Sequence, residues 1–122
     1  MPAIPPILLK KLYVSRSLRA EGDGFALDLT NPIAPGTITS FKGLEADGSA
    51  VPLEGAVIVS ATGESRAVAS ISAQSPLLFP LGAILTLRVG GVTLPPGPHS
   101  LKIRVVVQDV GPLEIPVSDE VA

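Results

Sequence analysis

In four stretches of this chain, apolar side chains recur at every second position, with polar side chains between them. The clearest stretch is 101–107, which reads LKIRVVV, and the others are 25–29 (FALDL), 85–89 (LTLRV) and 113–117 (LEIPV). A period of two with charged residues at the alternate positions is typical of an antiparallel strand that buries one face. Because helical periodicity is almost absent, the pattern predicts a β-rich chain.

Turn signals separate the predicted strands. They are EGDG at 21–24, Asp47-Gly48, TGE at 62–64 and DVG at 109–111. The first is expected to close a hairpin between 13–18 and 25–30, and Asp47-Gly48 can supply the positive φ angles of a tight hairpin turn. Pro116 cannot donate a ladder hydrogen bond, so the last strand is predicted to be an edge or to pair on one side only.

About seven or eight short strands at spacings near ten residues are typical of a sandwich or a small barrel. We predict a single antiparallel β-sandwich of immunoglobulin-like or Greek-key type, with residues 1–122 forming one domain. Residues 1–11 are expected to form an N-terminal arm or a short helical turn after Pro5 and Pro6, and they can equally form the first strand. Segment 74–82 is expected to connect the sheets. With three Phe, one Tyr and no Trp, the core must be aliphatic.

The composition excludes several classes of protein. Without cysteine the chain forms no disulfide and no thiolate metal site, which suits a reducing cytoplasm. The start has no cationic region before its apolar stretch, and no run approaches the roughly 20 apolar residues of a membrane helix. We therefore expect a soluble, cytoplasmic protein with no membrane partner. Thirteen prolines and few Asn, Gln and Met residues are also typical of heat-stable proteins.

The charge argues against nucleic acid as a partner. The formal net charge is -2, from 9 basic and 11 acidic residues spread along the chain, whereas nucleic-acid binders concentrate positive charge on one face. A solvated strand edge explains the local basic excess at Lys10, Lys11, Arg16 and Arg19. No interleaving of basic and aromatic residues is present to stack bases.

No nucleotide site is predicted. A phosphate loop needs glycines before a Lys-Ser/Thr pair that opens a helix, and no such string occurs. The glycines of 21–24 precede a strand pattern and so cannot present a helix N-terminus to a phosphate. Coenzyme-A-dependent reduction needs a nucleotide site, a proton-shuttling constellation and a far longer chain, and we do not expect it of this chain.

His99 is the one histidine, so a catalytic triad or a zinc site would depend on it. It lies in LPPGPHS at 94–100, a Pro-Gly turn that leads into a strand. No Gly-x-Ser-x-Gly elbow exposes a serine, and one histidine without cysteine is too little for zinc. We expect a structural or solvent-facing histidine, and we assign no catalytic, cofactor-binding or metal-ligating residue and no cofactor.

Paired carboxylates are the chemistry hardest to exclude, because a glycosidase-type hydrolase needs only two acids facing each other across a cleft. The candidates are Glu45 with Asp47, beside a turn where Asp is expected for backbone reasons, and Asp119 with Glu120 near the terminus. Sequence does not show which acids converge. A carbohydrate platform is not predicted, because aromatic residues are few and Phe25 and Phe41 are expected in the core.

The order of several pieces resembles the small β subunit of bacterial C-glycoside deglycosidases. The pieces are the strand 25–29, LEADG at 44–48 leading to Val51-Pro52, the strand 85–89, and LPPGPH at 94–99 before the strand 101–107. The similarity covers roughly residues 24–107. It implies a β-sandwich that supports a larger, metal-bearing catalytic subunit. Segment 108–122 departs from the pattern, since it lacks an aromatic, arginine-bearing tail, and this weighs against a position next to substrate.

Three functions remain as hypotheses. The first is a non-catalytic accessory or interaction protein, either the small subunit of a larger enzyme or a homo-oligomer, which docks through apolar surface at Val106 and 77–79. The second is a small-ligand-binding sandwich or barrel, which needs a partly apolar cavity. The third is a carboxylate-dependent hydrolase, which needs one acid pair to line a cleft. A protein partner or self-association is thus the expected mode of action.

Overall fold

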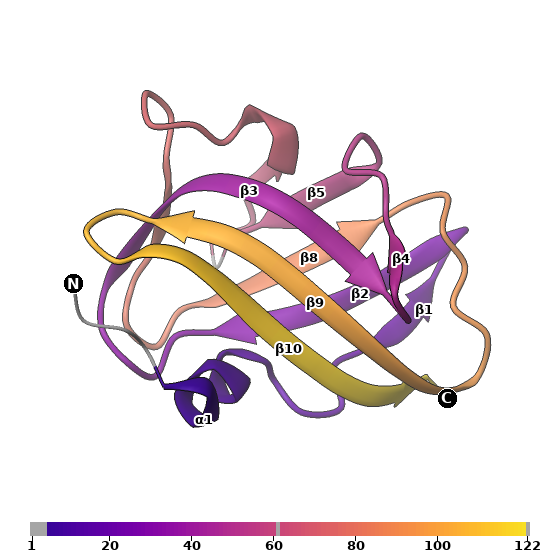
Figure 1. Ribbon diagram of the computed structural model, residues 1–122. Coiled ribbons are helices and arrows are strands. Elements are labelled where there is room, and N and C mark those ends of the chain that lie inside the picture. Colours follow the sequence, from indigo (N-terminus) through magenta and orange to yellow (C-terminus); the bar gives the residue numbers. More distant parts are fainter. Residues whose placement is uncertain (1–4, 61, 122) are drawn as a thin grey trace.

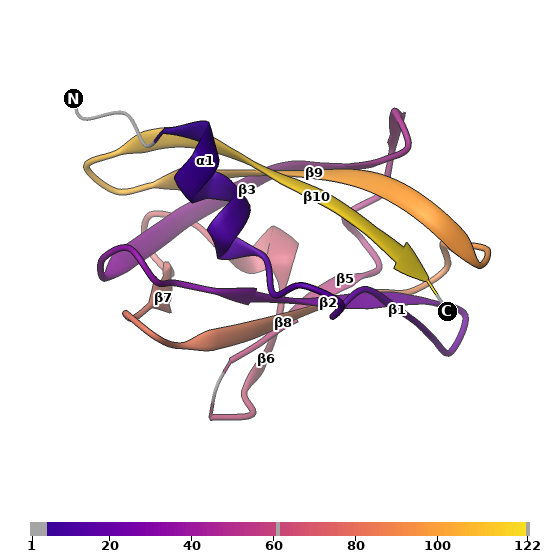
Figure 2. The same ribbon diagram turned by 90° about the horizontal axis from the view of Figure 1, so that it is seen from below.

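The chain folds as two antiparallel sheets packed face to face, in a computed structural model that describes residues 5–60 and 62–121 (Figure 1 and Figure 2). The first sheet has the order β1 (Arg19–Glu21), β2 (Gly24–Thr30), β8 (Ile84–Val89), β5 (Ala56–Val59) and β6 (Ser65–Ala67). The second has the order β10 (Gly111–Val121), β9 (Gly97–Val107), β3 (Gly36–Ala46) and β4 (Ser49–Ala50), and β7 (Leu77–Phe79) pairs with the start of β3. The predicted all-β sandwich is confirmed.

Helical structure is confined to short segments. Helix α1 (Pro6–Leu9) continues into the 3-10 turn η1 (Lys10–Leu12), and a second 3-10 turn, η2, covers Val68–Ser70. From Pro6 onward the structure therefore shows the helical alternative predicted for 1–11, while residues 1–4 of that prediction lie outside the described residues. None of the helices within 5–60 and 62–121 is long and apolar enough to cross a membrane.

Strand β3 explains why the sequence understates the length of the strands. The described residues form ten strands, more than the seven or eight short strands predicted, and β3, β9 and β10 each run for eleven residues. Register shifts between Ile38 and Ser40 and between Phe41 and Gly43 interrupt the pairing of β3 with β9. An extra residue at such a point moves the following side chains to the other face of the sheet. The period of two is therefore lost along β3.

The predicted hairpin turns are found where the sequence places them. Ala46 pairs with Ser49 across Asp47-Gly48, which have φ angles of 51° and 85°. Glu21 pairs with Gly24, so EGDG also forms a turn. The strand before that turn is β1, not the predicted segment 13–18. The reason is Arg16, whose φ of 67° bends the chain after Tyr13 has formed a single bridge with Leu29.

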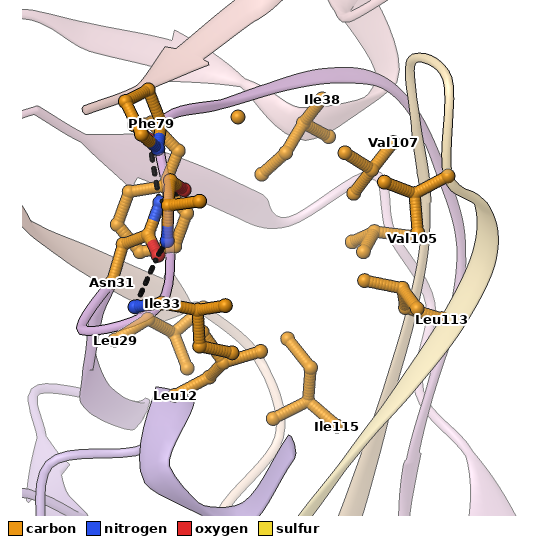
Figure 3. Close-up of a pocket in the computed structure, with 14 residues that line it drawn as sticks. Leu12, Leu29, Asn31, Ile33, Ile38, Phe79, Val105, Val107, Leu113 and Ile115 are labelled. Atoms are coloured by element: carbon orange, nitrogen blue, oxygen red, sulfur yellow. Dashed lines mark hydrogen bonds between the residues drawn. The ribbon is translucent and has the colours of Figure 1, made fainter. Parts of the chain in front are cut away.

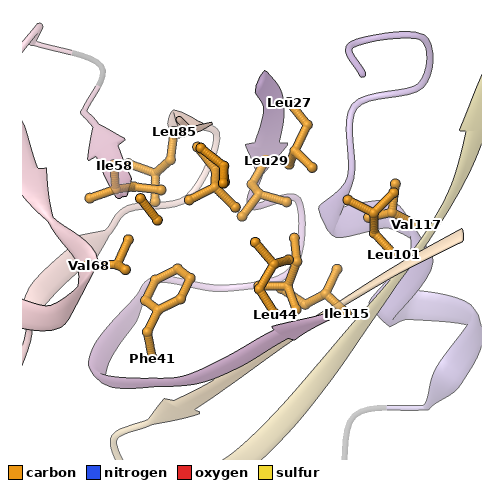
Figure 4. Close-up of a cluster of buried hydrophobic side chains, with 14 of the residues drawn as sticks. Leu27, Leu29, Phe41, Leu44, Ile58, Val68, Leu85, Leu101, Ile115 and Val117 are labelled. Atoms are coloured by element: carbon orange, nitrogen blue, oxygen red, sulfur yellow. The ribbon is translucent and has the colours of Figure 1, made fainter. Parts of the chain in front are cut away.

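The core between the two sheets is aliphatic, as the composition predicts. In Figure 4, Leu27 and Leu29 of β2 point toward the layer that contains Leu44 of β3 and Ile115 of β10. These four side chains are at most 3% exposed. Phe25 and Phe41 are buried as well, which confirms their predicted place in the core.

Most strands at the outer edges of the two sheets are short. Strands β1 and β6 have three residues each and β4 has two. Strand β10 is an edge strand, as Pro116 predicts, and contains a second proline, Pro112. Helix α1 and turn η1 also pack beside β10 (Figure 2).

Candidate functional site

His99 lies near the start of β9, at the end of the sandwich where β10 finishes (Figure 1). Its Nδ1 atom lies 2.6 Å from Oδ2 of Asp47 in the β3–β4 turn, and its Nε2 atom lies 2.7 Å from the carbonyl oxygen of Pro95. The His99 side chain is 7% exposed, against 49% for Asp47. Because both ring nitrogens face acceptors, both must carry a proton to complete the two hydrogen bonds.

The surroundings of His99 favour this charged imidazolium. The hydrogen bond to Asp47 is the main cause that raises the pKa of His99, the Pro95 carbonyl adds to it, and burial opposes both. The same bond, together with the Ser100 backbone N–H that donates to Asp47 Oδ1 over 2.9 Å, lowers the pKa of Asp47. The pair therefore links the β3–β4 turn to β9. Both ring nitrogens of His99 are thus engaged within this fold, and its structural role stays a prediction.

Asp119 is a second engaged acid at this end. Its Oδ2 atom accepts hydrogen bonds from the Tyr13 hydroxyl and from the Arg16 backbone N–H, both over 2.6 Å. The bond from Tyr13 is the main cause that lowers the pKa of Asp119. Burial, and then the bond to Asp119, raise the pKa of Tyr13. Asp119 thus anchors the segment that follows η1 to β10.

The two acid pairs named from the sequence have separate partners. Glu45 accepts a hydrogen bond from Arg104 over 2.8 Å, whereas Asp47 is bound to His99. Asp119 is bound to Tyr13, whereas Glu120 is exposed. Asp47, His99, Asp119 and Glu120 line one shallow depression, but its acids are exposed or half-buried and two of them already bind other side chains. Over the described ranges, no three His, Asp or Glu side chains are grouped to hold a metal ion.

An apolar cavity opens between the sheets at the opposite end of the sandwich, and we call it the end cavity. Its volume is about 210 Å³, and Asn31 is the one polar side chain among the fourteen residues that line it. Figure 3 shows Val105 and Leu113 on one side of the space and Leu12 and Leu29 on the other. The cavity opens to solvent at the rim, where Ala34 and Pro35 are exposed and Val110 is half-buried.

Asn31 holds the rim of the end cavity in place. Its Nδ2 atom donates to the carbonyl oxygens of Ala34 and Phe79 over 2.6 and 2.8 Å. Its Oδ1 atom accepts from the backbone N–H groups of Ile33 and Ala34 over 3.2 and 3.3 Å. The side chain is 4% exposed, and these four bonds use both of its donors and both of its acceptor positions. Asn31 therefore offers the cavity no free polar group.

The end cavity is not predicted from the sequence. Its walls come from η1, from the segment between β2 and β3, and from β7, β9 and β10, which lie far apart in sequence. The one available signal is Asn31 itself, the single asparagine of the chain, placed directly after an alternating strand. An apolar lining produces no motif, because its residue types are those of any core.

Three large aliphatic side chains are exposed around the turn from β7 to β8. They are Leu78, Leu81 and Ile84, which are 65%, 57% and 50% exposed, and we call them the β7–β8 corner. The prediction of apolar surface at 77–79 is right for Leu78 alone. Leu77 and Phe79 are buried, because β7 is a strand whose alternate side chains enter the core. Val106, the other predicted surface residue, is half-buried.

Comparison with known families gives a match over almost the whole chain. A family model described as Hydroxymethylglutaryl-CoA reductase, N-terminal domain, matches residues 8–122. The chain belongs to this family. The hydroxymethylglutaryl-CoA reductase N-terminal domain match spans both sheets, the His99–Asp47 pair and the end cavity. No curated protein matches the chain.

Membership of this family leaves two sequence-based expectations as they were. The match does not concern C-glycoside deglycosidases, so the resemblance to their β subunit stays a prediction. The second expectation is that this chain does not itself reduce a coenzyme A ester. The family description names a domain of a reductase and does not say whether that domain is active. That expectation also stays a prediction.

Proposed function

We propose that this chain is a non-catalytic accessory domain that acts by binding a larger catalytic polypeptide. The observation that carries the proposal is the exposure of Leu78, Leu81 and Ile84 within seven consecutive residues. Large aliphatic side chains that cluster on a surface commonly mark a contact site. The outer face of the second sheet is different in kind where Arg104 pairs with Glu45 and Glu114.

Two further observations support a catalytic polypeptide as the partner. The family is described as the N-terminal domain of a reductase, and an N-terminal domain of an enzyme is joined to the rest of that enzyme, which supports the proposal. The resemblance to the small subunit of C-glycoside deglycosidases implies the same arrangement. In addition, His99, Asp47 and Asp119 are engaged in contacts that join segments of this fold, which suits a supporting role.

The test is to co-express the chain with a catalytic polypeptide of the hydroxymethylglutaryl-CoA reductase family, and to measure the complex by light scattering. We expect a stable complex, and we expect Leu78→Ser/Leu81→Ser/Ile84→Ser to weaken it at least tenfold. Ile7→Ser is the matched control, because Ile7 is 70% exposed but lies on α1. Unchanged binding by the triple variant, or a chain that stays a monomer beside that polypeptide, would overturn the proposal.

The structure provides the partly apolar cavity that the ligand-binding hypothesis requires. The carboxylate-dependent hydrolase has weaker support, because in the depression that Asp119 and Glu120 share, Asp119 is already bound to Tyr13.

A further inference from the structure

We propose that the end cavity binds a medium-length aliphatic chain of about eight carbon atoms, whose polar head group stays outside the rim. This inference goes beyond the accessory role and does not depend on it, because the cavity and the β7–β8 corner have no residue in common.

The chemistry of the walls selects a hydrocarbon. Around Asn31, the lining consists of Leu, Ile, Val, Phe, Ala, Pro and Gly residues. The Asn31 amide is saturated by Ala34, Phe79 and Ile33, so the lining side chains give an entering molecule no hydrogen bond. A water molecule needs two to four polar partners to be stable in a buried site, and a cavity without them stays dry. An aliphatic chain that fills this space moves its own surface out of water and into apolar contact.

The size of the cavity sets the length of the chain. A dry cavity of about 150 Å³ with a comparable lining holds benzene, which has six carbon atoms. In proportion, a volume of about 210 Å³ accommodates roughly eight carbon atoms. Such a chain would enter past Ala34 and Pro35 and lie against Val105 and Leu113, in the space that Figure 3 shows.

The cavity is formed in advance by regular structure. Val105 and Leu113 face each other in the β9–β10 ladder, and Leu29 is held in β2 by its pairing with Leu85. The four hydrogen bonds of Asn31 hold the rim segment. Binding therefore has little ordering cost, which is the condition under which a small apolar pocket gives measurable affinity.

The test is a titration with butanol, hexanol, octanol and decanol, followed by NMR of the Ile, Leu and Val methyl groups. Burial of each methylene is expected to tighten the Kd about fourfold up to roughly eight carbons, after which the gain stops. The shifts are expected at Val105, Leu113 and Ile115, which line the cavity, and not at Leu81 or Ile84. Octanoate carries the same chain on a carboxylate head group, so comparing its Kd with that of octanol shows whether the site prefers a fatty acid or a neutral chain. Either preference supports the aliphatic site.

Two matched variants of β9 locate the site. Val107 lines the end cavity, whereas Val106, its neighbour on the same strand, does not. We expect Val107→Phe to weaken octanol binding at least tenfold, and Val106→Phe to change it less than twofold. If Val107→Phe does not fold, Gly36→Val replaces it. A Cβ atom at Gly36 has Val107 Cγ1, at 3.8 Å, as its one contact, so a side chain fits there.

The proposal is overturned if affinity does not depend on chain length, if the shifts fall on the β7–β8 corner, or if neither cavity-filling variant weakens binding. The same variants separate this site from the accessory role. Val107→Phe or Gly36→Val is expected to leave the complex with the catalytic polypeptide unchanged, and the triple variant of the corner is expected to leave octanol binding unchanged.

Discussion

The hydroxyl of Tyr13 lies 2.6 Å from Oδ2 of Asp119, a contact between residues 106 positions apart. The same hydroxyl accepts the backbone N–H of Leu18 over 2.9 Å. One phenol oxygen thus fixes both the segment that follows η1 and the last strand of the second sheet. The N-terminal segment is held to the sandwich by a specific polar contact as well as by packing.

Removing this hydroxyl is expected to destabilise the protein. Tyr13→Phe leaves the buried Leu18 N–H without its acceptor and Asp119 without its donor. An unpaired buried group of this kind costs about 1–3 kcal/mol of unfolding free energy, which urea denaturation measures. Asp119→Asn and the double variant complete the cycle. A loss below about 0.5 kcal/mol in Tyr13→Phe would contradict the role given to the contact.

The His99–Asp47 pair is expected to make stability depend on pH in two directions. The pKa of His99 is raised from its ordinary value of 6.5, so the stability it contributes is complete below that value and is lost as pH rises through the raised pKa. The pKa of Asp47 is lowered from 3.8, so its contribution is complete above that value and is lost as pH falls through the lowered pKa.

The measurement is the difference in unfolding free energy between the native protein and His99→Gln across this range. We expect the native protein to gain most between about pH 4 and pH 6.5, and the advantage to shrink in more alkaline and in more acidic buffer. A difference that stays constant with pH would show that the pair is not ionic in the folded state.

Asn31 provides a prediction about the rim of the end cavity. Asn31→Ala removes the partners of two carbonyl oxygens and two N–H groups at a buried site, and we expect a loss of about 3 kcal/mol in chemical denaturation. Asn31→Asp is expected to be worse, because a carboxylate oxygen would face the carbonyl oxygens of Ala34 and Phe79. If Asn31→Asp were the more stable of the two, the assigned orientation of the amide would be wrong.

Gly24 provides a test of how closely β2 approaches the end of β8. A Cβ atom at this position would lie 1.7 Å from the carbonyl oxygen of Val89, so the backbone must shift to accept any side chain. We expect Gly24→Ala to lower the unfolding free energy by more than about 3 kcal/mol or to prevent folding. Gly22→Asn is the control. Gly22 has a φ of 57°, a Cβ atom there would have no neighbour within 4 Å, and asparagine tolerates that conformation.

The sequence predicts those strands in which alternation and pairing coincide. Strand β2 pairs with β8, and β9 pairs with β10, without a register shift, and each of the four appears in the sequence as a period of two. In β3, the buried residues Ile38, Phe41, Leu44 and Ala46 follow at intervals of three, three and two. A pattern of that kind matches neither a regular strand nor a helix, so local reasoning does not identify it.

For the candidate sites, too, the sequence predicts local features but not contacts between residues that are far apart in the chain. The sequence predicts a Pro-Gly turn over 94–100 that leads into a strand, whereas β9 already begins at Gly97, so His99 lies inside the strand. Its partner Asp47 lies 52 residues away, and the sequence does not show that the two meet. The end cavity is even harder to predict from the sequence. It is a space between residues that lie far apart in the chain, such as Leu12, Phe79 and Val107, and its lining residues are of the same types as those of the core.

The edge strands of the two sheets determine how another molecule can bind to this one. The short edge strands leave few main-chain donors and acceptors for strand addition, and Pro112 and Pro116 remove two donors from the longer edge strand β10. Recognition is then left to side-chain shape and chemistry. The same short edge strands leave few main-chain sites through which copies of the chain could pair edge to edge into fibres.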